Sequence, residues 1–316
     1  MIAMLVAQVM THRPRTCGPH DPLNRAAQIM WDNDCGCVPV VDPNERPIGM
    51  ITDRDVCMAA FTQGRTLSEI SVEIAYGHPA VTVREDDPVE AAEDLMRRHQ
   101  LRRLPAVDAS GRTVGLLSIH DLAHQSEATL GRAERLRDTL ARICQPRAHR
   151  SLCDPASELV EEIMTSTVHT CTTADALVRP AQLMWEHDCG AIPVTRRGDC
   201  VAMVTDRDIC MAAYIQGTRL ADIGVAAAAS HRVYAVRAKD SIEGAHAIMR
   251  MYRVRRLPVV DAGDNLVGIL SLADIVRHRP LSASNDDALS SETLTRTLEQ
   301  ICHWHGEPAK PVSQSM

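Results

Sequence analysis

An internal repeat constrains the fold of this chain more than any local pattern does. The segment RAAQIMWDNDCGCVPV at residues 25–40 recurs as RPAQLMWEHDCGAIPV at residues 179–194. Farther along, TDRDVCMAA from Thr52 recurs as TDRDICMAA from Thr205, with eight of nine positions identical. Because the copies stand 153 to 154 residues apart along most of the length, the chain consists of two duplicated halves.

Each half contains a second, weaker repeat. Pro39 and Val40 and the following GMITDRD are echoed by Pro105 and Ala106 and the following GLLSIHD. Each quarter runs through an extended segment, a helix with apolar spacing, two short strands joined by a turn, and a second helix. The sequence therefore predicts an α/β (α+β) fold of four β-α-β-β-α units in two pairs. We expect these units at residues 2–62, 72–125, 158–216 and 225–279.

Each half also ends in an amphipathic segment, in the linker 126–157 and in the C-terminal stretch 280–316. Packing of this helix into the protein's own core is the simpler expectation, and docking into the groove of a partner is the alternative. After Cys302 the tail is expected to fray. The apolar residues that share one helical face are Leu136, Leu140 and Ile143 in the first half and Leu294, Leu298 and Ile301 in the second.

Composition excludes several classes of protein. The net charge of −7 gives no overall attraction to nucleic acid or to acidic membranes, and only eight aromatic residues are available for stacking on bases. No apolar run reaches the roughly 18 residues of a membrane span, and the N-terminus lacks the features of a signal peptide. The sequence predicts a cytoplasmic protein without nucleic-acid or membrane partners. Its eleven cysteines are expected to be reduced thiols.

A short motif occurs once in each unit: an apolar strand ending in Thr or Ser, two variable residues, and Asp. Four copies, each after a strand of the type hydrophobic-Pro-Val/Ala, resemble the CBS domain family, named after cystathionine β-synthase. The resemblance covers nearly the whole chain outside the linkers. In the third copy Ala202 replaces the usual glycine, and the second and fourth copies have Ser in place of Thr. The motif residues are Thr52 and Asp55, Ser118 and Asp121, Thr205 and Asp208, and Ser271 and Asp274.

The motif has two interpretations that are compatible with each other. As a capping box, the hydroxyl accepts an N–H of the helix and the acid three residues later complements the helix N-terminus. As a binding site, the same turn presents N–H groups to a phosphate, and the carboxylate can accept both hydroxyls of a ribose.

The resemblance implies the second interpretation. In CBS proteins the Asp holds the ribose of an adenine nucleotide, and the Thr or Ser lies near ribose or phosphate. The backbone of the hydrophobic-Pro-Val strand and of the first strand brackets the adenine. We therefore expect AMP, ADP, ATP or a related adenosyl ligand as a regulatory ligand, and no other cofactor. The strand residues expected beside adenine are Val38, Leu104, Ile192 and Leu257.

Arginines next to the motifs are candidates for phosphate contacts. Arg102–Arg103 and Arg255–Arg256 lead into the hydrophobic-Pro strands of the second and fourth units. Because adjacent residues of a strand point to opposite faces, one of each pair is expected to face the cleft and to pair with phosphate. A surface salt bridge is the alternative. Arg54 and Arg207, directly before the motif Asp, are further candidates with the same alternative.

Metal binding and catalysis receive little support from the sequence. The cysteines repeat between the halves at positions such as Cys57 and Cys210, which fits small buried residues, and the pair Cys35 and Cys37 lacks the spacing of a zinc site. His120 and His124 share a helix face without the Glu of a metalloprotease motif. No residues are expected to be catalytic or to bind a metal.

Three functions from different classes are candidates for a chain with this sequence. The leading one is an allosteric sensor that binds an adenine nucleotide and changes its packing against an unidentified regulated protein. An enzyme is disfavoured, because no nucleophile-base pair or Gly-rich phosphate loop occurs. An interaction or redox scaffold with vestigial clefts is the alternative. In either case we expect the two halves of one chain to close into a disc, as two separate CBS pairs commonly do.

Overall fold

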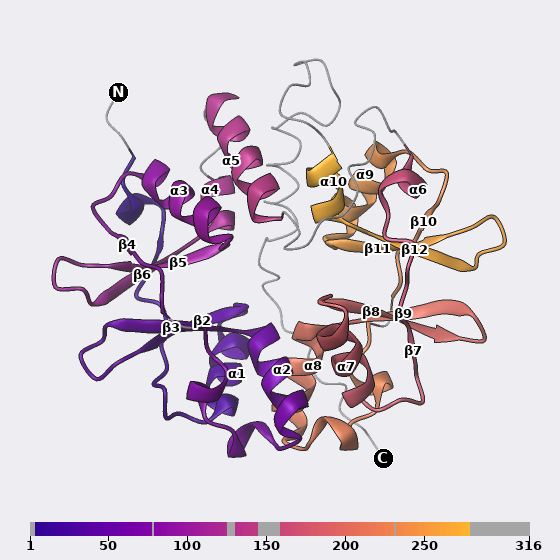
Figure 1. The fold of residues 1–316 in the computed structure, drawn as a ribbon, viewed down its shortest axis with the longest axis horizontal. Coiled ribbons are helices and arrows are strands. Elements are labelled where there is room, and N and C mark those ends of the chain that lie inside the picture. Colours follow the sequence, from indigo (N-terminus) through magenta and orange to yellow (C-terminus); the bar gives the residue numbers. More distant parts are fainter. Residues whose placement is uncertain (1–3, 78, 125–129, 145–158, 231, 279–316) are drawn as a thin grey trace, which may run out of the picture.

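The computed structural model describes residues 4–77, 79–124, 130–144, 159–230 and 232–278. Short strands and helices build four similar units arranged in a ring, with units 1 and 2 in indigo to magenta on one side and units 3 and 4 in rose to yellow on the other (Figure 1). The predicted mixed α and β architecture of four repeated units is confirmed.

Units 1 and 3 occupy equivalent places in the two halves. Their two longer strands form an antiparallel pair, in which Cys37 lies opposite Thr52 and Ala191 lies opposite Thr205. This register brings the end of the motif strand next to the start of its partner strand. Unit 1 contains α1 (Leu23–Asp32), β2 (Cys37–Val41), β3 (Pro47–Thr52) and α2 (Asp53–Gln63). Unit 3 contains β7 (Cys171–Thr172), α7 (Val178–Glu186), β8 (Ala191–Arg196), β9 (Asp199–Thr205) and α8 (Asp206–Gln216).

Units 2 and 4 correspond in the same way. As β7 does beside β8 in unit 3, a short strand in each runs parallel to the first strand of the antiparallel pair. Unit 2 contains β4 (Val83–Arg84), α3 (Val89–His99), β5 (Arg103–Val107), β6 (Thr113–Ser118) and α4 (Ile119–His124). Unit 4 contains β10 (Val236–Arg237), α9 (Ile242–Tyr252), β11 (Arg256–Val260), β12 (Leu266–Ser271) and α10 (Leu272–His278). Helix α5 (Leu130–Ile143) follows unit 2, and α6 (Val160–Ile163) lies at the start of unit 3.

The two units of each half exchange their leading segments. β1 (Thr11–His12) pairs antiparallel with β6, so this segment belongs to the sheet of unit 2 although it lies at the start of unit 1 in the sequence. In return Gly77, which leads into unit 2, forms a bridge with Met50 in β3 of unit 1. In the second half, Thr165 forms a bridge with Ile269 in unit 4, which corresponds to the pairing of Thr11 with Leu116 in the first half. The repeat gives the order of the segments but not this exchange, because hydrogen bonds rather than sequence order decide which sheet a strand joins.

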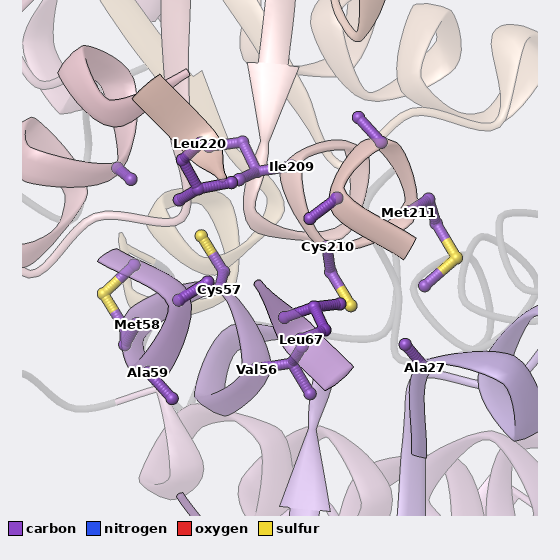
Figure 2. Packing of buried hydrophobic residues seen from close by; sticks show 14 of the residues in the cluster. Ala27, Val56, Cys57, Met58, Ala59, Leu67, Ile209, Cys210, Met211 and Leu220 are labelled. Atoms are coloured by element: carbon purple, nitrogen blue, oxygen red, sulfur yellow. The ribbon is translucent and has the colours of Figure 1, made fainter. Parts of the chain in front are cut away.

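Helices α1, α2, α7 and α8 join units 1 and 3 around one hydrophobic core that contains residues of both halves. Figure 2 shows its centre, where Cys57 and Cys210 are fully buried among apolar side chains of both halves. Helices α2 and α8 each contribute the sequence Cys-Met-Ala-Ala to this contact. Small side chains at the contact allow two helix axes to approach closely, which accounts for the many small residues here.

Units 2 and 4 share a second core, to which α5 contributes. Leu136, Leu140 and Ile143 are 1%, 5% and 8% exposed, and the helix contacts both α3 and α10. The linker helix therefore packs within its own chain, as the simpler expectation had it. Its C-terminal counterpart, with Leu294, Leu298 and Ile301, lies outside the described residues. Across the described ranges, none of the helices has the length and apolar character needed to cross a lipid bilayer.

Candidate ligand-binding cavity

All four motifs form the same cap where a strand turns into a helix. The N–H of Thr52 donates to Oδ2 of Asp55 at 2.8 Å, and the N–H of Asp55 donates to the Thr52 hydroxyl at 3.2 Å. The hydroxyl also donates to Oδ2 at 2.6 Å. The capping interpretation of the motif is thus what the structure shows. We refer to site 1 (Thr52, Asp55), site 2 (Ser118, Asp121), site 3 (Thr205, Asp208) and site 4 (Ser271, Asp274), which share this geometry.

The cap uses only one of the two carboxylate oxygens. Within the described ranges, Oδ1 of Asp55, Asp121 and Asp208 makes no hydrogen bond or ion pair. In site 4, by contrast, Nη2 of Arg277 donates to Oδ1 of Asp274. Burial raises the pKa of Asp55 and of Asp208, and the hydrogen bonds from the motif threonines oppose that rise. Three of the four sites therefore present a carboxylate oxygen that can accept hydrogen bonds from a ligand.

A cavity of about 1220 Å³ connects two of these sites across the two halves. Its lining includes both residues of site 2 and both residues of site 3. The exchanged segment at 11–15 contributes to the wall, as do residues 232–234 and 253–256. Among the described residues, neither site 1 nor site 4 contributes to the lining. The volume exceeds the roughly 300–1,000 Å³ of an ordinary small-molecule pocket, so the cavity has room for two ligands or one extended ligand.

The lining is cationic although the chain as a whole is acidic. Nine arginines and five aspartates face the cavity, a formal charge of +4 with histidine counted as neutral, whereas the whole chain carries −7. Walls of low dielectric constant focus such a field and concentrate counter-ions. The cavity is therefore suited to an anionic ligand.

Both members of each predicted arginine pair line the cavity, which corrects the expectation that only one would face it. The alternation rule applies only inside a strand, and Arg102 and Arg255 precede the strands, which begin at Arg103 and Arg256. The two strand residues are half-buried and the two preceding residues are exposed. Burial lowers the pKa of Arg256, and the nearby Arg102 and Arg255 lower it further, while Asp206 opposes the change.

Two glycines make room for the guanidinium groups of the half-buried Arg103 and Arg256. A Cβ at Gly36 would lie 3.3 Å from Nη2 of Arg103 and 3.1 Å from Oδ2 of Asp53. At Gly190 the equivalent Cβ would lie 3.0 Å from Nη2 of Arg256. Any larger residue would displace these groups, so the glycines allow an arginine of unit 2 or unit 4 to reach the helix start of unit 1 or unit 3. Burial and the neighbouring Asp206 raise the pKa of Asp53, against the effect of Arg103.

Arg54 and Arg207 bridge the two halves. Nη2 of Arg54 donates to Asp188 at 2.8 Å, and its Nη1 donates to the carbonyl oxygen of Cys189 at 2.8 Å. Nη2 of Arg207 donates to Asp34 at 2.6 Å. These ion pairs correspond to the salt-bridge alternative for both arginines, although Arg207 also lines the cavity.

The strand residues expected beside adenine lie in the hydrophobic core. Because side chains alternate along a strand, the neighbours of these residues face the cavity instead, namely Cys37, Pro39, Ala191 and Pro258. Only the backbone of the predicted residues remains available to a ligand. The buried residues, each 0–1% exposed, are Val38, Leu104, Ile192 and Leu257.

The replacement of the usual motif glycine by Ala202 is accommodated by a smaller neighbouring residue. In unit 1 a Cβ at the equivalent Gly49 would lie 1.9 Å from the ring of Tyr76. The residue equivalent to Tyr76 in the second half is Ala229, and both Ala202 and Ala229 are buried. The smaller Ala229 leaves space for the methyl group of Ala202, so the substitution does not disturb site 3.

Several residues that line the cavity were not among those predicted from the sequence. The ring of Tyr234 stacks on Tyr252 with centroids 3.8 Å apart, and Tyr234 faces the cavity near site 3. His120 and His124, expected on a solvated face, also line the cavity, with their Nε2 atoms 3.1 Å apart. Nothing in the motif marks Tyr234, because the chain segments that carry Tyr234 and the motif come together only through the segment exchange. In the described part of the chain, no three His, Cys, Asp or Glu side chains cluster in a way that could hold a metal ion.

A family model described as CBS domain matches four stretches of the chain, residues 6–61, 72–127, 160–214 and 222–280. The CBS domain-containing protein YhcV of Bacillus subtilis is 35% identical over 132 residues, which cover 42% of this chain and 93% of that protein. Hypoxic response protein 1 of Mycobacterium tuberculosis is 36% identical over 120 residues, covering 38% of this chain and 83% of that protein.

A solved structure resembles nearly the whole ring. The protein MJ1225 from Methanocaldococcus jannaschii aligns with a TM-score of 0.59 at 17% identity, over 87% of this chain and 99% of that chain. At this level of identity the likeness concerns the fold alone.

Proposed function

This chain belongs to the CBS domain family, and from that membership we propose that it is a non-enzymatic regulatory protein that binds adenine nucleotides in its central cavity. The observation that carries the proposal is the combination of charges in that cavity. Two motif carboxylates with an available Oδ1 atom, Asp121 and Asp208, share one space with a formal excess of four positive charges.

A nucleotide matches both kinds of group. Its ribose diol donates hydrogen bonds to a carboxylate oxygen, and its phosphate accepts the paired N–H groups of arginine. In site 3 the diol binds Oδ1 of Asp208, and the phosphate extends toward Arg255 and Arg256. Tyr234 offers a flat apolar surface for the base. Site 2 provides the same functions through Asp121 and the pair Arg102–Arg103.

Sites 2 and 3 are the preferred sites because the two halves have diverged in charge. Arg232 and Arg253 line the cavity near site 3, whereas the residues 153 positions earlier are Pro79 and Gln100. Arg13 and Arg15 line it near site 2, whereas their counterparts 154 positions later are Thr167 and His169. Site 1 retains its capped Asp55 and is a weaker candidate for the same ligand.

Regulation follows from the position of the cations. Arg102 comes from unit 2 and Arg255 and Arg256 come from unit 4, so like charges of the two halves face each other across the cavity. A bound phosphate offsets this repulsion and draws units 2 and 4 together. Nucleotide occupancy is thereby converted into a change in packing between the halves, which a regulated protein can detect.

The redox scaffold is the weaker proposal. Cys57 and Cys210 are fully buried, and burial raises the pKa of both thiols well above the usual value. Buried neutral thiols react slowly with oxidants.

Calorimetric titration and thermal unfolding with AMP, ADP, ATP, S-adenosylmethionine and adenosine test the proposal. A ligand that binds only the native state raises the melting temperature, and at 100 times its dissociation constant it adds about 2.7 kcal/mol of stability. We expect at least one phosphate-bearing adenine nucleotide to do so. If none of these compounds raises the melting temperature or releases heat at millimolar concentration, the proposed function is wrong.

A further inference from the structure

Arg277 distinguishes unit 4 from the other three units. It lies three residues after the motif carboxylate, and Nη2 of Arg277 donates to Oδ1 of Asp274. The cap does not use Oδ1, because it is Oδ2 that accepts hydrogen bonds from the N–H and the hydroxyl of Ser271, at 2.8 and 2.5 Å. Both oxygens of Asp274 therefore have partners, and the side chain of Asp274 is only 10% exposed. The corresponding residues in units 1, 2 and 3 are Met58, His124 and Met211.

The same guanidinium also contacts the linker helix. Nη1 of Arg277 donates to the carbonyl oxygen of Cys144 at 2.9 Å, and Cys144 directly follows α5. The last carbonyl groups of a helix lack partners within the helix and carry partial negative charge, so a cation there is favourable. From unit 2, Gln100 donates to the carbonyl oxygen of Arg142 at 3.4 Å. The end of α5 is thus held by both halves, and Arg277 is its contact from unit 4.

We propose that Arg277 closes site 4 to nucleotides and couples that closure to the docking of α5. The proposal rests on the proposed function, because it takes a ribose diol as the ligand of a motif carboxylate. A diol at Asp274 needs the Oδ1 atom that Arg277 occupies, so ribose and guanidinium exclude each other. When ribose displaces Nη2, the guanidinium also loses the partner that orients Nη1 toward Cys144, and the end of α5 is released from unit 4.

Two consequences follow for the whole protein. Wild-type protein leaves site 4 empty at nucleotide concentrations that fill sites 2 and 3. Replacing Arg277 opens a further site, whose occupancy depends on Asp274. The residue three positions after the motif carboxylate therefore helps to determine how many nucleotides a chain binds.

The first experiment counts the AMP molecules bound per chain by calorimetry. Arg277→Met installs the residue found in units 1 and 3, and we expect one more bound AMP than in wild type. The double variant Arg277→Met/Asp274→Asn is expected to return to the wild-type number. Arg219→Met is the matched control, because Arg219 forms an ion pair of the same i, i+3 spacing with Asp222 in the segment between units 3 and 4. An unchanged number of bound AMP in Arg277→Met, with wild type binding AMP normally, overturns the closure of site 4.

The second experiment needs no nucleotide and so separates this inference from the proposed function. Hydrogen exchange of the amides at 140–144 is compared between wild type and Arg277→Met. We expect exchange about tenfold faster in the variant, as follows from the loss of one charged hydrogen bond at the helix end. Arg219→Met should leave it unchanged. Arg277→Lys, which keeps the charge but cannot span both partners, should give a smaller acceleration and serves if Arg277→Met does not fold. Equal exchange in wild type and in the variants overturns the coupling to α5, whether or not wild type binds AMP.

Discussion

The guanidinium of Arg207 donates a 2.6 Å hydrogen bond to the carboxylate of Asp34, a residue 173 positions earlier in the chain. Arg54 and Asp188 form the equivalent contact at 2.8 Å in the opposite direction. Asp34 and Asp188 both have positive φ angles, 44° and 46°, which aspartate tolerates better than most residues. The two ion pairs therefore join the halves by reciprocal contacts beside the helical core of units 1 and 3.

These ion pairs are expected to add little stability. The side chains of Arg207 and Asp34 are 36% and 46% exposed, and exposed pairs contribute about 0–1 kcal/mol. We expect Asp34→Asn, which preserves the tolerance for positive φ, to lower the free energy of unfolding in urea by less than about 1 kcal/mol. Asp222→Asn, at the exposed pair with Arg219 between units 3 and 4, is the control. A loss of several kcal/mol would mean that this contact, and not the apolar core, holds the halves together.

The thiols at the centre of that core should be inert. Because the thiolate is the reactive form and burial disfavours it, we expect Cys57 and Cys210 to be alkylated at pH 8 at least about 100-fold more slowly than the partly exposed Cys144. Peptide mass spectrometry of the folded protein measures the three rates. Unfolding in urea should make them equal. Comparable rates in the folded protein would contradict the buried interface.

Acid should destabilise the protein through His246. Burial on α9, and secondarily Arg250, lowers the pKa of His246 from 6.5 to about 4. Above pH 6.5 the ring is neutral in both the folded and the unfolded chain, so it has no effect on stability there. As the pH falls from 6.5 to 4, only the unfolded chain takes up the proton, and the free energy of unfolding decreases by up to about 3 kcal/mol.

We expect His246→Gln to remove most of this loss between pH 7 and pH 4.5, measured by urea unfolding at each pH. His20→Gln is the control, because the His20 side chain is 84% exposed. If wild type and His246→Gln lose stability equally over this range, His246 is not the buried neutral group that the structure indicates.

Nucleotide binding should depend on the motif carboxylates that face the cavity. Asp208→Asn keeps an acceptor for the cap but loses the charge that receives the ribose diol. A hydrogen bond to a charged group contributes about 1.5–3 kcal/mol, so we expect AMP to bind about 10- to 100-fold more weakly. The same holds for Asp121→Asn at site 2. Calorimetry decides, and unchanged affinity in both variants would exclude the two sites.

The arginines should make that binding sensitive to phosphate and to salt. We expect AMP to bind more tightly than adenosine, and the affinity for AMP to fall between low and physiological ionic strength. Arg256→Ala should reduce the preference for AMP over adenosine about tenfold, in keeping with the loss of one charged hydrogen bond of about 1.5 kcal/mol. Arg219→Ala, far from the cavity, should leave the preference unchanged. Equal affinity for AMP and adenosine in wild type would contradict a phosphate-binding role.

Much of the fold was predictable from the sequence because the same pattern of strands and helices occurs in both duplicated halves. The motif at Thr52 and Asp55 fixes a strand end and a helix start, and its recurrence from Thr205 locates the second half. The site was predictable only in part. Motif residues are set by local hydrogen bonds, whereas Tyr234 and Arg13 reach the cavity through an exchange of segments that leaves no local pattern. The pairing of Asp274 with Arg277 also depends on a single residue that differs between otherwise similar units.

The exchange of leading segments has a consequence for how the protein reaches its native state. Thr11 pairs with Leu116, so the sheet of unit 2 cannot be completed until a chain end more than 100 residues away has returned to it. Contacts of such long sequence separation slow folding, because the loop must close before its contacts stabilise it. A single unit cut from the chain would lack one strand and expose the edge that strand covers. The pair of units is accordingly the smallest block in which the exchanged strands find their partners, and it is also the block that the duplication copied.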